Sequence, residues 1–301
     1  MTTPRLHVTS RRGLVLLASA LTVGAAAAGG SILDLSPDPD LAAGAGFGTP
    51  GLHYSYGRAV ALGNGQARTY VVVDGMTGNP TEVGVAVSEQ AMEGLPAQSP
   101  HRGPGHHGAF SEYLLELPAH NPTPYRFVEV DWNPQGHGGP YVAPHFDFHF
   151  YRVPLATRNE IDLSAPDFAE RAARLPAPEE IPAGYASTHV LLNTTPAGMT
   201  VPRMGLHWVD TGSPELPPRN QPFTTTFIVG SWNGQVIFDE PMVTRDFILA
   251  QRTGPATAEA MPVAPAKRYL PAGFYPATYG ITWDEANREY RIALQGLSRK
   301  E

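Results

Sequence analysis

Apolar and polar residues alternate with a period of two in short segments along most of the chain, which predicts β-strands. Residues 67–74 (ARTYVVVD) and 81–88 (TEVGVAVS) flank turn-forming residues, so we expect them to form a hairpin. Further strands are predicted at 112–117, 125–132, 141–153, 188–192, 206–209, 224–230, 236–240 and 291–297. Trp232-Asn233-Gly234 indicates a tight turn between two of these strands.

Helical signals are few. Residues 167–175 (DFAERAARL) give the clearest one, with Asp167 as the expected N-cap, and a short helical turn is expected at 89–95. The apolar face of the longer helix would consist of Phe168, Ala172 and Leu175. We find no internal repeat, and the many closely spaced strands predict a mainly β fold. We expect one β-sandwich or barrel-like domain over residues 51–301, with a few short helices.

The N-terminal segment has the pattern of an export signal. A basic start precedes an apolar run over 14–28 and an acidic, proline-containing stretch over 34–40. Residues 10–16 (SRRGLVL) also resemble a twin-arginine signal. We therefore predict a signal peptide over 1–28, cleaved after one of residues 26–28, and a flexible leader over 29–50.

An uncleaved anchor is the alternative to a signal peptide, although the apolar run is shorter than the ~20 residues that a membrane span needs. The remaining sequence contains no second hydrophobic span. We therefore expect a periplasmic or extracellular protein with no stable membrane span after signal cleavage.

Composition restricts the chemistry that the chain can perform. The net charge is −7 and no basic stripe occurs, so a nucleic-acid partner is not expected. The 301 residues include no cysteine, which excludes disulfides, thiolate ligands and cysteine nucleophiles. A bound metal would need His, Asp or Glu ligands, which suit zinc, manganese, iron, nickel or copper.

The most informative segment is rich in histidine and extends from His137 to His149. Its second half alternates strictly, so that His145, Asp147 and His149 share one face of a strand. The opposite face would present Phe146, Phe148 and Phe150 to the core. The Cα atoms of His145 and His149 would lie about 13 Å apart on a straight strand, near the limit for binding one ion. A solvated polar face is the simpler alternative.

Two later segments could complete a metal site. His207 lies in PRMGLHWVD (202–210), and Glu240 ends a predicted strand in FDEPM (238–242). We predict a divalent metal, most simply zinc, bound by His145, His149, His207 and Glu240. Glu240 would be the fourth ligand or a general base, unless it is an ordinary strand-end acid.

The roles of two neighbouring residues stay open. Asp147 would bind the metal directly or orient a ligand from behind it, and it is a further candidate for a catalytic carboxylate. His137, in its glycine-rich turn, would likewise be a ligand or support one.

The other histidines give weaker signals. Three lie in a loop rich in proline and glycine, where solvation explains them: His101, His106 and His107. His53, His120 and His189 are isolated and receive no role. The chain contains no Gly-x-Ser-x-Gly elbow, phosphate loop, dinucleotide fingerprint or His-Glu-x-x-His motif, which disfavours the familiar enzyme classes that depend on them.

Several blocks resemble a bacterial TTHB-like domain family of unknown function. They are WNPQGH (132–137), PHFDFHFY (144–151), PRMGLHWVD (202–210), FDEPM (238–242) and GFYPATYGI (273–281). The resemblance extends over about residues 50–297. It implies an exported, homo-oligomeric protein with shared metal-binding positions at His145, His149 and His207.

These observations together predict an exported metal-binding protein of undetermined activity, with metal-assisted hydrolysis or hydration as the first reaction to consider. One alternative is a non-catalytic envelope protein with a structural metal or a bound small molecule. Another is a carbohydrate-binding surface that uses the rings of Trp132, Trp208, Trp232 and Tyr151.

Overall fold

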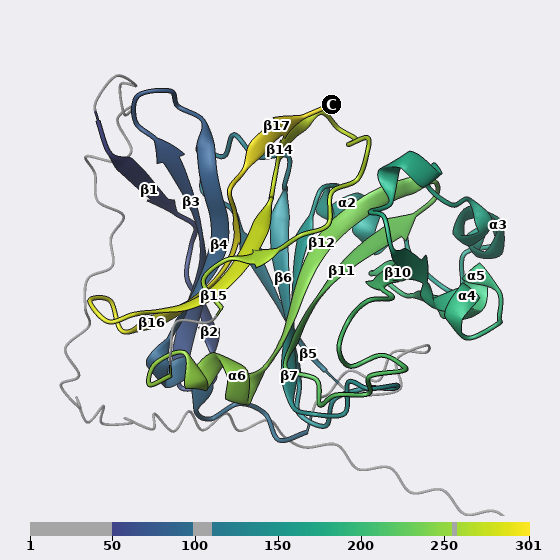
Figure 1. Cartoon of the computed structure of the whole chain (residues 1–301), viewed down its shortest axis with the longest axis horizontal. Coiled ribbons are helices and arrows are strands. Elements are labelled where there is room, and N and C mark those ends of the chain that lie inside the picture. The colour runs from purple at the N-terminus through teal and green to yellow at the C-terminus, as the bar shows by residue number, and fades with distance from the viewer. Residues whose placement is uncertain (1–49, 99–109, 255–257) are drawn as a thin grey trace, which may run out of the picture. The chain divides into compact units, whose positions relative to one another are not determined.

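The computed structural model describes residues 50–98, 110–254 and 258–301, and these form a mainly β structure of antiparallel sheets with a few short helices (Figure 1). This confirms the predicted fold class. The sheets of the described residues pack as in a sandwich and do not close into a barrel. The predicted signal peptide, the predicted leader up to residue 49 and the three loop histidines lie outside the described residues.

The first sheet has the order β1-β3-β4-β16-β15-β13, with β2 paired to β3. Its strands are β1 (Leu52–Tyr56), β2 (Val60–Leu62), β3 (Gly65–Asp74), β4 (Pro80–Ser88), β13 (Met261–Pro262), β15 (Thr278–Asp284) and β16 (Glu289–Gln295). The predicted hairpin is β3 and β4, which pair antiparallel.

The second sheet has the order β5-β6-β7-β12-β11-β10-β8, with β9 paired to β10. Its strands are β5 (Ser111–Glu116), β6 (Phe127–Asn133), β7 (His145–Tyr151), β8 (Tyr185–Ser187), β9 (Thr200–Val201), β10 (Gly205–Asp210), β11 (Thr225–Trp232) and β12 (Gln235–Thr244). A separate pair consists of β14 (Gly273–Tyr275) and β17 (Ser298–Lys300).

Short helices connect these strands. They are η1 (Glu89–Met92), α2 (Leu155–Asn159), α3 (Phe168–Ala173), η2 (Pro178–Glu180), α4 (Thr188–Leu191), α5 (Pro196–Met199) and α6 (Arg245–Ala250). Across the described ranges 50–98, 110–254 and 258–301, none of the helices combines the length and apolar character that a membrane crossing requires.

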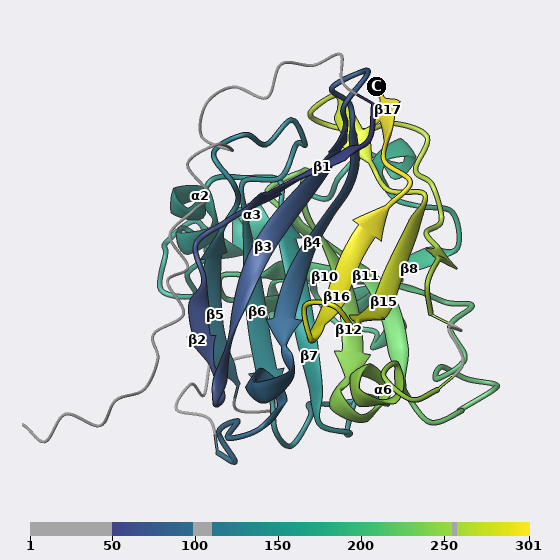
Figure 2. The ribbon, with the colours of Figure 1, turned by 90° about the vertical axis from the view of Figure 1, so that its left-hand side faces the viewer.

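The main core lies between the two sheets, which Figure 2 shows one behind the other. The first sheet contributes valines such as Val71 and Val85, and the second contributes Phe146, Phe148 and Phe150. These side chains occupy alternate positions along their strands, as the period of two requires. The phenylalanine face of the histidine-rich strand is therefore core, as predicted.

Three sequence predictions need correction. Residues 188–192 were expected to form a strand, but Thr188–Leu191 is the helix α4. The segment THVLLN lacks period-two alternation, and its apolar residues Val190, Leu191 and Leu192 are exposed instead of paired in a sheet. The strand predicted over 141–153 begins only at His145, because Pro140 and Pro144 keep the preceding residues in a loop.

The third correction concerns α3. Asp167 occupies the N-cap position as predicted and the helix begins at Phe168, but in the described structure the Asp167 side chain makes no capping hydrogen bond. Phe168 and Ala172 are buried as predicted, whereas Leu175 lies beyond the helix and is exposed.

Candidate metal centre

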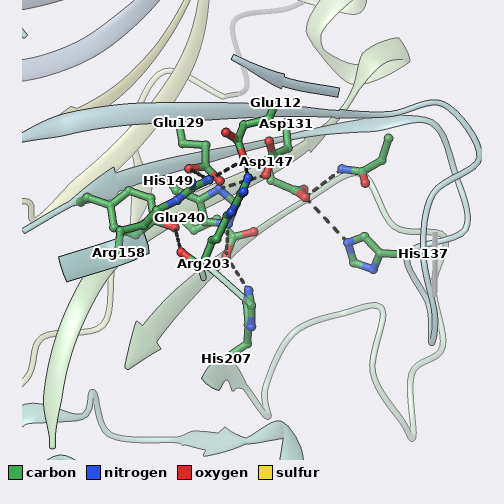
Figure 3. Close-up of polar contacts among 12 residues, drawn as sticks. Glu112, Glu129, Asp131, His137, Asp147, His149, Arg158, Arg203, His207 and Glu240 are labelled. Atoms are coloured by element: carbon green, nitrogen blue, oxygen red, sulfur yellow. Dashed lines mark hydrogen bonds and ion pairs between the residues drawn. The ribbon is translucent and has the colours of Figure 1, made fainter. Parts of the chain in front are cut away.

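The second sheet has a polar face, on the side opposite the main core. It is formed by β5, β6, β7, β12 and β10 and carries Glu112, Glu129, Asp131, Asp147, His149, Glu240 and His207 (Figure 3). Asn133 and His145, which pair across β6 and β7, lie on the same face. The cross-strand pairs between β6 and β7 place Glu129 opposite His149 and Asp131 opposite Asp147. Alternation on adjacent strands thus collects ionisable groups on one surface.

Other parts of the chain bury this polar face. Towards the Tyr151 end of β7, an apolar cluster includes Phe168 and Trp232. Towards the other end of β7, another group of apolar side chains includes Tyr141 and Phe223. The ionisable groups between these two apolar groups are therefore shielded from water, and Glu129 and His149 are each 0% exposed.

His149, His207 and Glu240 converge from three strands. The Nε2 atom of His149 lies 3.6 Å from Oε2 of Glu240, and Nε2 of His207 lies 3.8 Å from the same oxygen. One potential ligand atom from each residue falls within 4.8 Å of the other two. We call this group the first cluster.

The geometry of the first cluster depends on Gly230 of β11. Gly230 is opposite His207 in one register and opposite Phe238 in the other. A Cβ atom at this position would lie 2.0 Å from the Phe238 ring. The ring occupies that space and contacts both imidazoles, with centroid distances of 4.7 Å to His149 and 5.5 Å to His207. Gly230 therefore permits Phe238 to hold the two histidine rings in place.

A second layer of carboxylates lies behind His149. Oδ2 of Asp131 is 3.7 Å from Nδ1 of His149, on the side of the ring away from Glu240. Glu129, Asp131 and His149 also form a group that could hold a metal. Arg158 forms ion pairs with Glu129 and with Glu112. Glu129 is therefore a buried carboxylate with a cation beside it.

Burial shifts the ionisation of these acids. It raises the pKa of Glu240 well above its ordinary value, and the charges of Asp147 and Glu129 raise it further. Burial also raises the pKa of Asp131, with added repulsion from Glu129 and Asp147. The pKa of Glu129 is raised by burial to about 8 although Arg158 opposes the shift. Burial therefore favours the protonated form of these three acids at neutral pH, and a cation bound beside them would favour the ionised form.

His137, His145 and Asp147 form a second cluster at the other end of β7. Oδ1 of Asp147 lies 3.3 Å from Nε2 of His145, and Oδ2 lies 3.9 Å from Nε2 of His137. Burial opposes ionisation of Asp147, but His145, His137 and His149 together outweigh burial and lower the pKa of Asp147. The charge of Asp147, with hydrogen bonding to Asp147 and to the Ala143 backbone, raises the pKa of His145 against the effect of the burial of the ring.

The first cluster fits a metal ion on two counts. Its N···O separations exceed the 2.7–3.2 Å of an N–H···O hydrogen bond. Ligands about 2.1 Å from a tetrahedral zinc ion would lie about 3.4 Å apart, close to the observed separations. In addition, among the described residues Oε2 of Glu240 has no hydrogen-bond partner although it is buried. A native protein rarely leaves such an atom unsatisfied.

The structure divides the predicted ligands between the two clusters. His149, His207 and Glu240 come together, whereas His145 lies with His137 and Asp147. Sequence reasoning overlooked Glu129 and Asp131. The signal was present in FVEVDWN (127–133), where acidic residues alternate with Val128, Val130 and Trp132 in the same way as in the histidine strand.

The remaining histidines and the aromatic residues do not join these clusters. His53, His120 and His189 belong to none of the three groups found among the described residues. Trp132, Trp232 and Tyr151 are buried and Trp208 is partly buried, so the four rings do not form an exposed stacking platform.

Comparison with known proteins finds a family model that matches part of the chain, and it indicates no activity. No curated protein and no solved structure matches the chain significantly. The match to a family model ends at Trp132, before the histidine-rich segment, and therefore does not include the two clusters. That model is TTHB210-like, described as hypothetical protein TTHB210, and its match to residues 76–132 confirms the predicted resemblance to a TTHB-like domain of unknown function.

Proposed function

We propose that this is an exported protein that binds a divalent metal ion, most simply zinc, through His149, His207 and Glu240. The convergence of three buried or partly buried ligand atoms from β7, β10 and β12 carries the proposal. Export is supported by the signal pattern over residues 1–28, and a homo-oligomeric state by the family resemblance.

Each residue has a distinct part in the proposed site. Nε2 of His149, Nε2 of His207 and Oε2 of Glu240 would be the ligand atoms, because these three face one another. Asp131 would accept a hydrogen bond from Nδ1–H of His149 and fix the tautomer that presents Nε2 to the metal. Mixed nitrogen and oxygen ligands suit zinc better than magnesium or calcium.

The ligand set supports metal-assisted hydrolysis or hydration as the activity. Two histidines and one carboxylate leave a fourth tetrahedral position for water, whose pKa a zinc ion lowers to about 7. The His207 side chain is 16% exposed, so this side of the cluster is the one nearest to solvent. A structural metal in a non-catalytic protein is the second possibility, and the near-complete burial of His149 and Glu240 favours it.

Metal content and affinity test the proposal. Protein purified without a histidine tag should contain zinc, and Glu240→Gln should lower zinc affinity on the order of 100-fold or more, because an amide is a poorer ligand than a carboxylate. Asp210→Asn is the matched control, since Asp210 lies on the same strand as His207 but belongs to none of the metal groups found in the described residues. Unchanged affinity in Glu240→Gln would refute the site.

A generic ester such as p-nitrophenyl acetate distinguishes the two roles of the metal. A catalytic zinc predicts hydrolysis that chelation abolishes and zinc restores. A structural zinc predicts no hydrolysis but a lower melting temperature after chelation, because a ligand that binds only the folded state stabilises it.

A further inference from the structure

The second cluster lies at the junction of β7 and the loop before it. The loop contains Gly136, whose φ of 63° and 2.3 Å approach of a Cβ position to the Tyr141 carbonyl require glycine. The backbone N–H of His137 then donates to that carbonyl at 2.9 Å. This turn brings the His137 ring back over β7, where its centroid is 4.7 Å from that of His145.

The hydrogen bonds of the second cluster leave its ligand atoms aimed at one another. Nδ1 of His145 lies 2.6 Å from the carbonyl oxygen of Ala143, which can only accept, so Nδ1 carries the proton. Nε2 is the remaining ring nitrogen and faces Asp147. Asn133 donates to Oδ2 of Asp147 at 2.8 Å and fixes the orientation of the carboxylate.

Burial makes this arrangement costly without a bound cation. His145 is 0% exposed and Asp147 is 4% exposed. Within the described part of the chain, neither Nε2 of His145 nor Oδ1 of Asp147 completes a hydrogen bond. Buried polar atoms that lack such bonds destabilise the fold, and direct coordination of an ion would offset this cost.

We propose that His137, His145 and Asp147 form a second divalent-metal site, so that each chain binds two ions. Two imidazoles and a carboxylate select zinc or another late first-row metal. The site shares no ligand with the first cluster. Asp147 and His149 are two residues apart on one strand face, about 7 Å between Cα atoms, so two ions can bind side by side.

The second metal would organise the loop that it holds. Residues Gly139, Pro140, Val142 and Ala143 of this loop line a groove of about 590 Å³ together with Phe223. Phe223 also packs against the His145 ring, with centroids 5.5 Å apart. A metal that ties His137 to β7 therefore fixes one wall of the groove.

Zinc stoichiometry of single variants tests the second site. The probe is zinc alone, titrated into the purified full chain against a competing chelator. We expect two zinc ions per wild-type chain and one in His137→Ala, whose side chain is 22% exposed, so the substitution should leave the fold intact. The double variant His137→Ala/His207→Ala should bind none. His120→Ala, at an exposed histidine outside both clusters, should still bind two.

The possible results separate this proposal from the first. One zinc per wild-type chain that is lost in His207→Ala and kept in His137→Ala would overturn the second site alone. One zinc that is lost only in His137→Ala would support the second site and refute the first. Two zinc ions retained by a folded His137→Ala protein would also overturn the second site. Asp147→Asn, which keeps the side-chain shape, provides an independent variant and should likewise lose one zinc ion.

Discussion

The two faces of strand β7 are equally buried and chemically opposite. Phe146, Phe148 and Phe150 pack in the main core, while His145, Asp147 and His149 face the carboxylates of the neighbouring strands. Burying the phenylalanines stabilises the fold through the hydrophobic effect. Burying the ionisable row removes charges from water and costs free energy unless partners compensate. The comparison indicates that the apolar face stabilises the strand, whereas the polar face adds no comparable stability unless cations of the proposed kind bind there.

The charge balance of the polar face supports this conclusion. Its carboxylates on β5, β6, β7 and β12 are Glu112, Glu129, Asp131, Asp147 and Glu240. Arg158 forms ion pairs with Glu129 and Glu112. Asp131, Asp147 and Glu240 face histidines at longer separations. Divalent cations at the two clusters would supply positive charge next to these three acids.

Phe148→Ala should give the largest effect on stability, because it removes a fully buried ring from the core face. We expect a loss of about 3–5 kcal/mol in the free energy of unfolding. Urea denaturation in the presence of a chelator measures this loss without a contribution from bound metal. The folded fraction of the variant should still bind zinc. A loss below about 1 kcal/mol would show that the apolar face of β7 does not have the stabilising role assigned to it.

Much of the fold was accessible from the sequence, because alternation is a local property. The hairpin of β3 and β4 and the strand β7 follow from their own residues. In contrast, β9 is two residues long and β2 is three, too short for a periodic signal, and both exist through pairing with their neighbours. Such elements depend on tertiary contacts that no local pattern encodes.

The candidate site was predictable in its residue types but not in its grouping. The alternation in PHFDFHFY places His145 and His149 on one face, yet it does not say which of them meets His207. That choice depends on the order β7-β12-β11-β10, which positions β10 two strands from Glu240, and on the absence of a side chain at Gly230. Strand order is a property of the assembled sheet, so the sequence left the division into two clusters open.

Asp131→Asn sharpens the comparison on the polar face. Asp131 faces Nδ1 of His149, so its loss should weaken zinc binding at the first cluster by roughly 10–100-fold. The metal-free protein should be as stable as the wild type or more stable, because a buried carboxylate becomes a neutral amide of the same shape. Competitive zinc titration and urea denaturation with a chelator measure the two effects separately.

The control for Asp131→Asn is again Asp210→Asn, which should leave zinc binding unchanged. A variant that lost several kcal/mol of metal-free stability and kept its zinc affinity would assign a structural role to Asp131, and the contrast between the two faces would then fail at this position.

The smallest effect is expected at Asp74, a partly exposed carboxylate outside both clusters, which extends the comparison to an acid that is in contact with water. Hydrogen bonds from the backbone and side chain of Thr77 lower the pKa of Asp74, with a smaller contribution from the backbone of Met76. Because the folded pKa lies below the unfolded value of about 3.9, the ionised group stabilises the fold above that pH. The stabilisation is lost as the pH falls through the folded pKa. The stability difference between wild type and Asp74→Asn, measured by urea denaturation, should therefore be constant from about pH 5 to 7 and shrink below about pH 4. A difference that persisted undiminished at lower pH would show that the turn depends on the shape of this side chain and not on its charge.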